Sequence, residues 1–172
     1  MTLRNNLGYN PAMHQLAIRP MMAEDIPLVV DWMLSVPLWQ RYQVNANAAR
    51  AQFEHGLRQG DILLVSDRGV ESRAVGFTWC LPDGAFGLSA YLRLIGVRPD
   101  HARFGIGTAL LAQTERLALR FAKDIFLLVS DFNVDAQRFY QRHGYTQMGA
   151  IPAYVLPDVT ELIFRKKLQN VG

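Results

Sequence analysis

The chain has 172 residues, of which 50% are hydrophobic, 19% charged and 10% aromatic. This composition is typical of one globular domain with its own core, and it excludes a disordered tail, a collagen-like chain and a charged coiled coil. The charged fraction lies below the usual level of about 25%, which indicates that a partner subunit or a ligand covers part of the surface and leaves a homodimer open.

A formal net charge of +3 makes the chain weakly basic, but its basic residues are scattered. The densest basic run, Arg165–Lys167, is too short for the continuous stripe of a nucleic-acid-binding surface, so we expect no nucleic acid partner. Cys80 is the only cysteine, which excludes an intrachain disulfide and a cysteine-cluster zinc site, and we expect no metal. No run reaches the roughly 18 apolar residues of a membrane helix, and the N-terminus lacks the apolar core of a signal peptide. We therefore expect a soluble, cytoplasmic protein without membrane contact.

The hydrophobic pattern predicts a flexible N-terminal arm over residues 1–15 and one domain over residues 16–168. The predicted elements are, in chain order, a strand over 16–19, helices over 26–34 and 45–59, strands over 62–66, 73–81 and 91–97, a helix over 108–121, a strand over 125–129, a helix over 134–143, and strands over 146–155 and 160–168. Pro37 ends the first helix and Pro82–Gly84 closes the third strand. The almost wholly apolar run Ile125–Val129 predicts a strand buried on both faces. The strand–helix–strand unit in the middle of the chain requires one parallel pairing, so the sheet is expected to be mixed.

The segment from Leu94 to Leu111 holds the most informative pattern. Gly105-Ile106-Gly107 comes directly before a predicted helix, where backbone N–H groups can turn outward around an anion such as a diphosphate. Leu110 stands where a dinucleotide-binding fingerprint needs a third small residue, and a Gly-Lys-Ser/Thr loop is absent. The alternative is ordinary close packing at a helix start.

Two motifs in this order resemble the GCN5-related N-acetyltransferase (GNAT) family, and the likeness extends from about Leu16 to Leu168. The first motif comprises Val97, Pro99 and Gly105–Leu111, and the second comprises Asn133, Ala136, Phe139, Tyr140, Gly144 and Tyr145. The resemblance implies an α/β (α+β) single-domain GNAT fold, with a mixed, mainly antiparallel sheet and helices on both faces. It also implies acetyl-CoA as co-substrate.

The resemblance assigns cofactor-binding roles to particular residues. The backbone of Ile95, Gly96 and Val97 would bind the pantetheine arm as an added strand, and Gly96 would form a bulge there unless it is a packing glycine. The loop amides would hold the diphosphate; the loop residues concerned are Arg103, Phe104, Gly105, Ile106, Gly107 and Thr108. Ala136 and Phe139 would line the same site, and Asn133 would either touch the pantetheine or cap its helix. Ala102 departs from the family, which has Gln or Arg there, and Arg103 stands where the family often has Gly.

The resemblance also assigns catalysis. Tyr140 would be the general acid for the CoA sulfur, the alternative being a core tyrosine, and the Val97 N–H would hold the oxyanion. A lysine-like amine with a pKa of about 10.4 is almost fully protonated near neutral pH, so a base is needed. The strand over 91–97 supplies no acid or histidine. Turn or surface roles are expected for His101, Asp83 and Asp131, and a water chain is the favoured base.

Aromatic residues near the expected acceptor pocket indicate a small amine with an apolar body, although core packing explains them equally well. They are Trp39, Tyr42, Phe86, Tyr91 and Tyr154. The predicted function is transfer of an acetyl group from acetyl-CoA to the primary amine of a small molecule. The alternatives are a non-catalytic acyl-CoA-binding module and an acetyltransferase acting on a protein or peptide amine.

Overall fold

The structure is a computed structural model that describes residues 16–69 and 71–169. The arm expected over residues 1–15 lies outside the described residues. In chain order the elements are β1 (Leu16–Pro20), α1 (Asp25–Met33), α2 (Pro37–Arg41), α3 (Ala46–Gln59), β2 (Ile62–Arg68), β3 (Gly76–Ala85), β4 (Ser89–Val97), a 3-10 helix (Pro99–His101), α4 (Ile106–Ala118), β5 (Asp124–Ser130), α5 (Val134–Arg142), β6 (Thr146–Pro152) and β7 (Thr160–Lys167).

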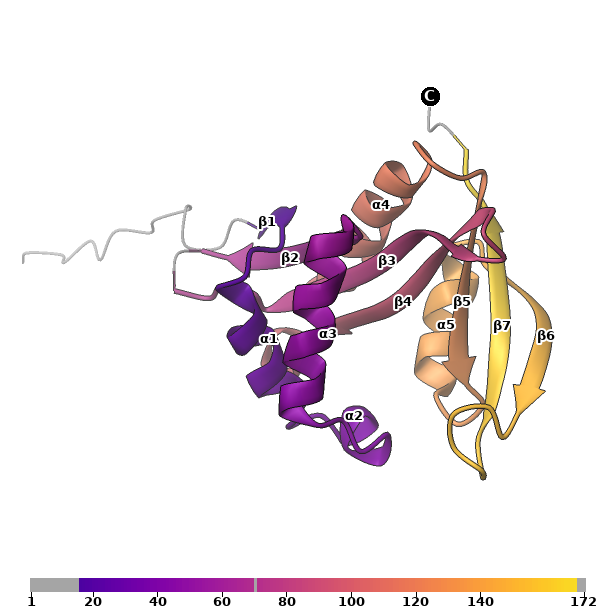
Figure 1. Ribbon diagram of the computed structural model, residues 1–172, viewed down its shortest axis with the longest axis horizontal. Coiled ribbons are helices and arrows are strands. Elements are labelled where there is room, and N and C mark those ends of the chain that lie inside the picture. Colours follow the sequence, from indigo (N-terminus) through magenta and orange to yellow (C-terminus); the bar gives the residue numbers. More distant parts are fainter. Residues whose placement is uncertain (1–15, 70, 170–172) are drawn as a thin grey trace, which may run out of the picture.

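The strands form one 7-stranded sheet in the order β1-β2-β3-β4-β5-β7-β6 (Figure 1). Among the strands of the described residues, only β4 and β5 pair in parallel, as the strand–helix–strand unit requires, and the other pairings are antiparallel. The mixed, mainly antiparallel sheet is therefore confirmed.

The two faces of the sheet carry separate apolar clusters, each covered by helices. Residues of α1 and α3 pack on one face, where Phe53 lies edge-on to Phe77 with ring centroids 5.4 Å apart. Residues of α4 and α5 pack on the other face, around Leu110 and Phe164. Each large apolar side chain buried in this way stabilises the fold by about 1.5–3 kcal/mol. The helices therefore lie on both faces, as expected.

The prolines explain two differences between the predicted and observed elements. Pro37 ends no structure; it occupies the first turn of the additional helix α2, where its fixed φ and missing N–H cost nothing. β3 continues through Pro82–Gly84 to Ala85, because the pairing with β4 shifts register between Leu81 and Ala85 and needs no donor from the proline.

The expectation that β5 is buried on both faces is wrong. Ile125, Leu127 and Val129 are buried on the α4–α5 face, whereas Phe126 and Leu128 are only half-buried. α1 and α3 pack over β2 and β3 instead, and this part of the sheet borders a cavity.

The strands β4 and β5 stay paired over a short distance and then diverge (Figure 1). Their pairing ends at Leu92 and Leu127. On the β3 side, Trp79 pairs with Leu94 and Cys80 with Leu92, so Arg93 is an extra, bulged residue. Beyond Leu92, no strand of residues 16–69 or 71–169 pairs with the β4 edge that faces β5.

The bulge does not involve Gly96, contrary to expectation. A Cβ at Gly96 would lie 2.9 Å from Phe77 Cε1 and 3.1 Å from Trp32 Cη2. The residue is therefore a packing glycine that lets α1 approach the sheet, which was the alternative interpretation.

Candidate active site

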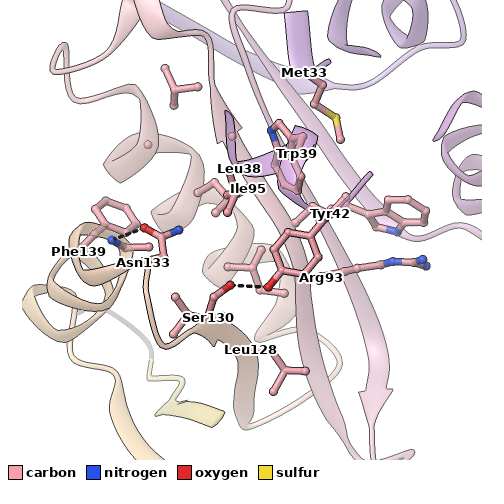
Figure 2. A pocket seen from close by; sticks show the side chains of 18 of the residues that line it. Met33, Leu38, Trp39, Tyr42, Arg93, Ile95, Leu128, Ser130, Asn133 and Phe139 are labelled. Atoms are coloured by element: carbon pink, nitrogen blue, oxygen red, sulfur yellow. Dashed lines mark hydrogen bonds between the residues drawn. The ribbon is translucent and has the colours of Figure 1, made fainter. Parts of the chain in front are cut away.

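A cavity of about 1020 Å³ occupies the gap between the diverging strands (Figure 2). It brings together all predicted site residues except Phe104: Ile95, Gly96 and Val97 of β4, Arg103, Gly105, Ile106, Gly107 and Thr108 of the loop and α4, and Asn133, Ala136, Phe139 and Tyr140 of α5. The ring of Phe104 is exposed and lies 3.7 Å below the Arg68 guanidinium, outside this lining. Only the backbone of Phe104 belongs to the loop.

The free edge of β4 offers backbone groups to the cavity. Just after β4, the Arg98 N–H donates to the Val75 carbonyl at 2.7 Å, on the β3 side. Successive residues of an extended strand direct their N–H groups to alternate edges, so Ile95 and Val97 direct theirs to the other edge, where β5 has diverged. The groups of Gly96 point toward β3. An extended ligand in the gap can therefore pair with Ile95 and Val97.

The loop before α4 has the backbone geometry of an anion cradle. Arg103 and Gly105 adopt left-handed φ values of 68° and 74°, and α4 begins at Ile106 with no side chain capping it. The first N–H groups of a helix have no intrahelical partner and carry a partial positive charge. This end of the cavity therefore suits an anion.

Gly107 keeps the cradle open without adopting an unusual conformation. A Cβ there would make only ordinary contacts, 3.7 Å from the Phe139 ring and 3.8 Å from Val97 Cγ2. Across from the cradle, the His143 ring lies 3.1 Å from Thr108 Oγ1 and 2.7 Å from the Phe139 carbonyl, which joins α5 to the start of α4.

The helix α5 positions the polar groups of the second motif. Asn133 is its N-cap: its side chain accepts a hydrogen bond from the Ala136 N–H at 3.2 Å, so the capping interpretation holds. The ring of Tyr140 packs into the core, 5.4 Å from Phe139 and 5.5 Å from Tyr145 between centroids. Tyr140 is therefore both a core residue and a cavity residue.

Burial, with a smaller contribution from Tyr91, raises the pKa of Tyr140 well above its usual value near 10. The phenol therefore keeps its proton throughout the physiological pH range. A group that stays protonated can donate a hydrogen bond or a proton, but it cannot act as a base.

The far end of the cavity has aromatic walls. Trp39, Tyr42 and Tyr91 line it, as expected for an acceptor pocket. Phe86 and Tyr154 do not: both are largely exposed, at 81% and 62%.

A buried carboxylate, which the sequence did not reveal, also lies at this end. Glu161 of β7 lines the cavity and is only 4% exposed. The Tyr42 hydroxyl donates to Glu161 Oε1 at 2.5 Å and lies 2.5 Å from Ser130 Oγ (Figure 2 shows the Tyr42–Ser130 contact). Tyr42 and Glu161 are 119 residues apart, so no local pattern points to their contact.

The residues for which turn or surface roles were expected, His101, Asp83 and Asp131, do not line the cavity. Asp131 is exposed and accepts from the Thr160 N–H at 3.3 Å, and Asp83 is exposed on β3. His101 lies beside Asp100 at 3.0 Å. Within residues 16–69 and 71–169 no group of three or more His, Cys, Asp or Glu side chains could hold a metal ion. Nor does this part of the chain contain a helix long and apolar enough to cross a membrane.

The fold and the site together indicate the class of protein. It is an α/β protein in which the diverging parallel strands β4 and β5 and the N-terminus of α4 line one continuous cleft. Such a cleft suits an extended ligand with an anionic end. The model of the acetyltransferase (GNAT) family matches residues 28–145. The chain therefore belongs to this acetyltransferase family, which confirms the resemblance.

Individual relatives agree with this assignment. The chain is 30% identical over 156 residues to a mycothiol acetyltransferase of Clavibacter michiganensis, an alignment that covers 83% of this chain and 46% of that protein. The chain thus spans about half the length of this relative. A GNAT-family acetyltransferase structure from Desulfovibrio desulfuricans has a TM-score of 0.75 at 20% identity, covering 90% of this chain and all of the other. YncA from Salmonella typhimurium with acetyl-CoA has a TM-score of 0.73 at 18% identity, over 92% and 96% of the two chains. At these identities the two structures support the fold.

Proposed function

We propose that this protein transfers the acetyl group of acetyl-CoA to the primary amine of a small molecule. The observation that carries the proposal is the continuity of the cavity from the cradle before α4 to an aromatic end that holds a buried carboxylate. A module that only bound acyl-CoA would need the first end and not the second.

Different residues along the cavity bind different parts of acetyl-CoA. The N–H groups of Gly105–Thr108 bind the diphosphate, with Arg103 as a charge partner. The backbone of Ile95 and Val97 pairs with the pantetheine arm as an added strand. This register brings the thioester toward the β4 bulge at Arg93, about 13 Å from Val97. The Val97 N–H therefore binds the pantetheine arm and is not proposed as the oxyanion donor that the resemblance implied.

Tyr140 is proposed as the general acid. Its phenol is protonated and lines the cavity, so it can donate a hydrogen bond or a proton to the departing CoA sulfur, although the raised pKa makes it a weak acid. A thiol with a pKa of about 8–9 leaves readily, so Tyr140 accelerates the reaction without being indispensable. Phe139 and Ala136 form the wall of the cleft beside it.

A small acceptor fits the aromatic end better than a folded protein does. Trp39, Tyr42 and Tyr91 surround a pocket that is suited to an apolar body attached to an amine. The Clavibacter relative is named for acetylating mycothiol, which is a small molecule, and this supports the same substrate class. A flexible peptide N-terminus could enter the same end, so peptides belong in the test.

The decisive experiment is an acceptor screen with detection of free CoA thiol. Purified protein and acetyl-CoA are incubated with small primary amines of different polarity and with short peptides. We expect turnover with amines that carry a compact apolar group. Turnover with peptides alone would replace small molecules by peptides as acceptors, and acetyl-CoA binding with no turnover for any amine would favour the binding module.

A further inference from the structure

The scheme above gives no role to Glu161, which lines the cavity beside Tyr42. The residue is 4% exposed and lines the cavity from β7, opposite Ser130 on the neighbouring strand β5. Carboxylates are rarely buried to this extent unless a cation or several donors compensate their charge, because burial removes the hydration of the ionised form.

The described residues compensate the negative charge of the Glu161 carboxylate only in part. Within the described residues, its single hydrogen-bond partner is the Tyr42 hydroxyl on Oε1, and no Lys or Arg nitrogen lies within 4.0 Å. Arg41, which adjoins Tyr42 in sequence, pairs with Asp158 at 3.2 Å, and Arg93 of the cavity lining stacks on Trp79 and donates to Gln52. The second carboxylate oxygen is therefore available to a ligand.

Tyr42 fixes the orientation of this carboxylate. Burial and, next, the hydrogen bond to Glu161 raise the pKa of Tyr42 to about 12, so the phenol stays protonated. Its single hydrogen goes to Glu161, and the Ser130 hydroxyl donates in turn to the Tyr42 oxygen. The Ser130–Tyr42–Glu161 chain therefore supplies one hydrogen bond and no positive charge.

Tyr91 connects the acceptor end to the proposed acid. Burial chiefly raises the pKa of Tyr91, and the charge of Glu161 adds to this effect. Tyr91 in turn contributes to the raised pKa of Tyr140. Tyr91, Tyr140 and Glu161 all line the same cavity, so the carboxylate and the proposed acid open into one continuous space.

We propose that Glu161 binds the ammonium form of the acceptor and accepts its proton, as the catalytic base of this enzyme. The proposal rests on the proposed transfer to a primary amine. The ammonium gives one proton to Glu161, the neutral nitrogen forms the C–N bond, and the C–S bond breaks. The second nitrogen proton is lost as the amide forms, while the CoA sulfur gains one and leaves as the thiol. Glu161 then returns its proton to solvent, so the net reaction releases one proton.

The test compares Glu161→Gln with the wild-type protein on two amines of the same shape. Glutamine keeps an oxygen that can accept from Tyr42, but it can neither pair with an ammonium nor take a proton. With phenethylamine, which is protonated at the assay pH, we expect kcat/KM to fall about 100-fold or more. With β,β-difluorophenethylamine, whose electron-withdrawing fluorines leave much more neutral amine, the loss should be at least about tenfold smaller. A merely structural role would lower both rates alike.

Two further variants serve as controls. Asp158→Asn removes an exposed carboxylate that likewise bonds to the α2 region, through Arg41, and should leave both rates within about twofold of wild type. Glu161→Asp keeps the charge and should restore part of the phenethylamine rate. All variants should bind acetyl-CoA with unchanged affinity in calorimetric titration.

The possible outcomes separate this proposal from the proposed function. If the wild-type protein acetylates these amines and Glu161→Gln does so equally well, or loses both rates in proportion, the role of Glu161 is wrong and the proposed function stands. If neither these amines nor any other in the screen is acetylated although acetyl-CoA binds, both fail. If Glu161→Gln does not fold, the amine-dependent difference is measured on Glu161→Asp, and equal losses on both amines overturn the proposal.

Discussion

At the scale of single residues, the two parts of the Tyr140 side chain have different surroundings. The ring packs in the core, whereas the hydroxyl has no hydrogen-bond partner among the described residues. The variant Tyr140→Phe keeps the ring and its contacts with Phe139 and Tyr145. Because general acids contribute about 10²–10⁴-fold and a thiolate is a good leaving group, we expect kcat to fall about 10- to 100-fold. The KM for acetyl-CoA should change much less. Steady-state kinetics with an amine from the acceptor screen measure both.

The thermal melting temperature controls for damage to the fold, and removal of an unpartnered hydroxyl should leave it nearly unchanged. Wild-type kcat in Tyr140→Phe, under conditions where chemistry limits the rate, would make Tyr140 a packing residue.

The backbone conformation of Arg103 is expected to lower the stability of the fold, whereas its side-chain charge is expected to favour acetyl-CoA binding. Its φ of 68° costs a residue with a Cβ about 1 kcal/mol or more, whereas glycine adopts it freely. Arg103→Gly should therefore raise the melting temperature, yet it should weaken acetyl-CoA binding because a charge partner of the diphosphate is lost. Arg103→Ala removes the same charge and keeps the strain, so it should bind as weakly without the gain in stability. Equal melting temperatures for the two variants would contradict the strain argument.

At the scale of elements, the start of α4 decides whether the cleft is open. A valine at Gly107 adds a Cβ that makes only ordinary contacts with Phe139 and Val97, and φ at this position is not left-handed. Gly107→Val should therefore fold normally, as judged by circular dichroism, while its methyl groups project into the cleft. We expect acetyl-CoA affinity to fall at least about tenfold, measured by calorimetric titration. Unchanged affinity would mean that the diphosphate binds elsewhere.

A second prediction at this scale concerns the buried ion pairs of Asp25, which join the start of α1 to β1 and to the segment before β3. Asp25 is fully buried and accepts from Arg19 at 2.6 and 2.9 Å and from Arg73 at 3.1 Å. Burial alone would raise the pKa of Asp25, but the hydrogen bonds from Arg19 and the Met22 N–H, together with both positive charges, lower it below 3.8. The stability that Asp25 contributes is therefore fully present above about pH 4 and is lost as the pH falls through the lowered pKa of the folded state.

The variant Asp25→Asn measures this contribution. It removes the buried charge that faces Arg19 and Arg73, which are partly exposed and keep Asp67 and Glu24 as partners, so it should cost about 1–3 kcal/mol at pH 7 in denaturant unfolding. The difference from wild type should shrink in acid, where the wild-type carboxyl is protonated too. A difference that does not depend on pH would show that the charge of Asp25 is not what stabilises the fold.

How much the sequence reveals also differs between elements. Segments with a clear local pattern, such as the helical spacing of α3 and the apolar run of β5, lie within a few residues of their predicted positions because local burial determines them. The short helix α2 was missed because Pro37 both ends and begins helices, and only its surroundings decide which. The residues of the cradle were predicted because they are consecutive. Glu161 was not, since its contact with Tyr42 depends on how distant segments meet in the folded chain.

At the scale of the whole molecule, acetyl-CoA should stabilise the folded protein because it binds between the diverging halves of the sheet. A ligand in the cavity contacts β4, α4 and α5 together, and β4 and β5 pair only over Ala90–Leu92 and Ile125–Leu127. A ligand that binds only the native state adds about 2.7 kcal/mol at 100 times its Kd, which corresponds to a rise in melting temperature of roughly 5–10 °C for a domain of this size. Thermal melts with acetyl-CoA, and with acetyl-pantetheine as a control that lacks the diphosphate, measure the effect. The control should stabilise the protein far less, because the cradle before α4 stays empty. An unchanged melting temperature at millimolar acetyl-CoA would contradict binding in this cavity, and equal stabilisation by both ligands would contradict the cradle.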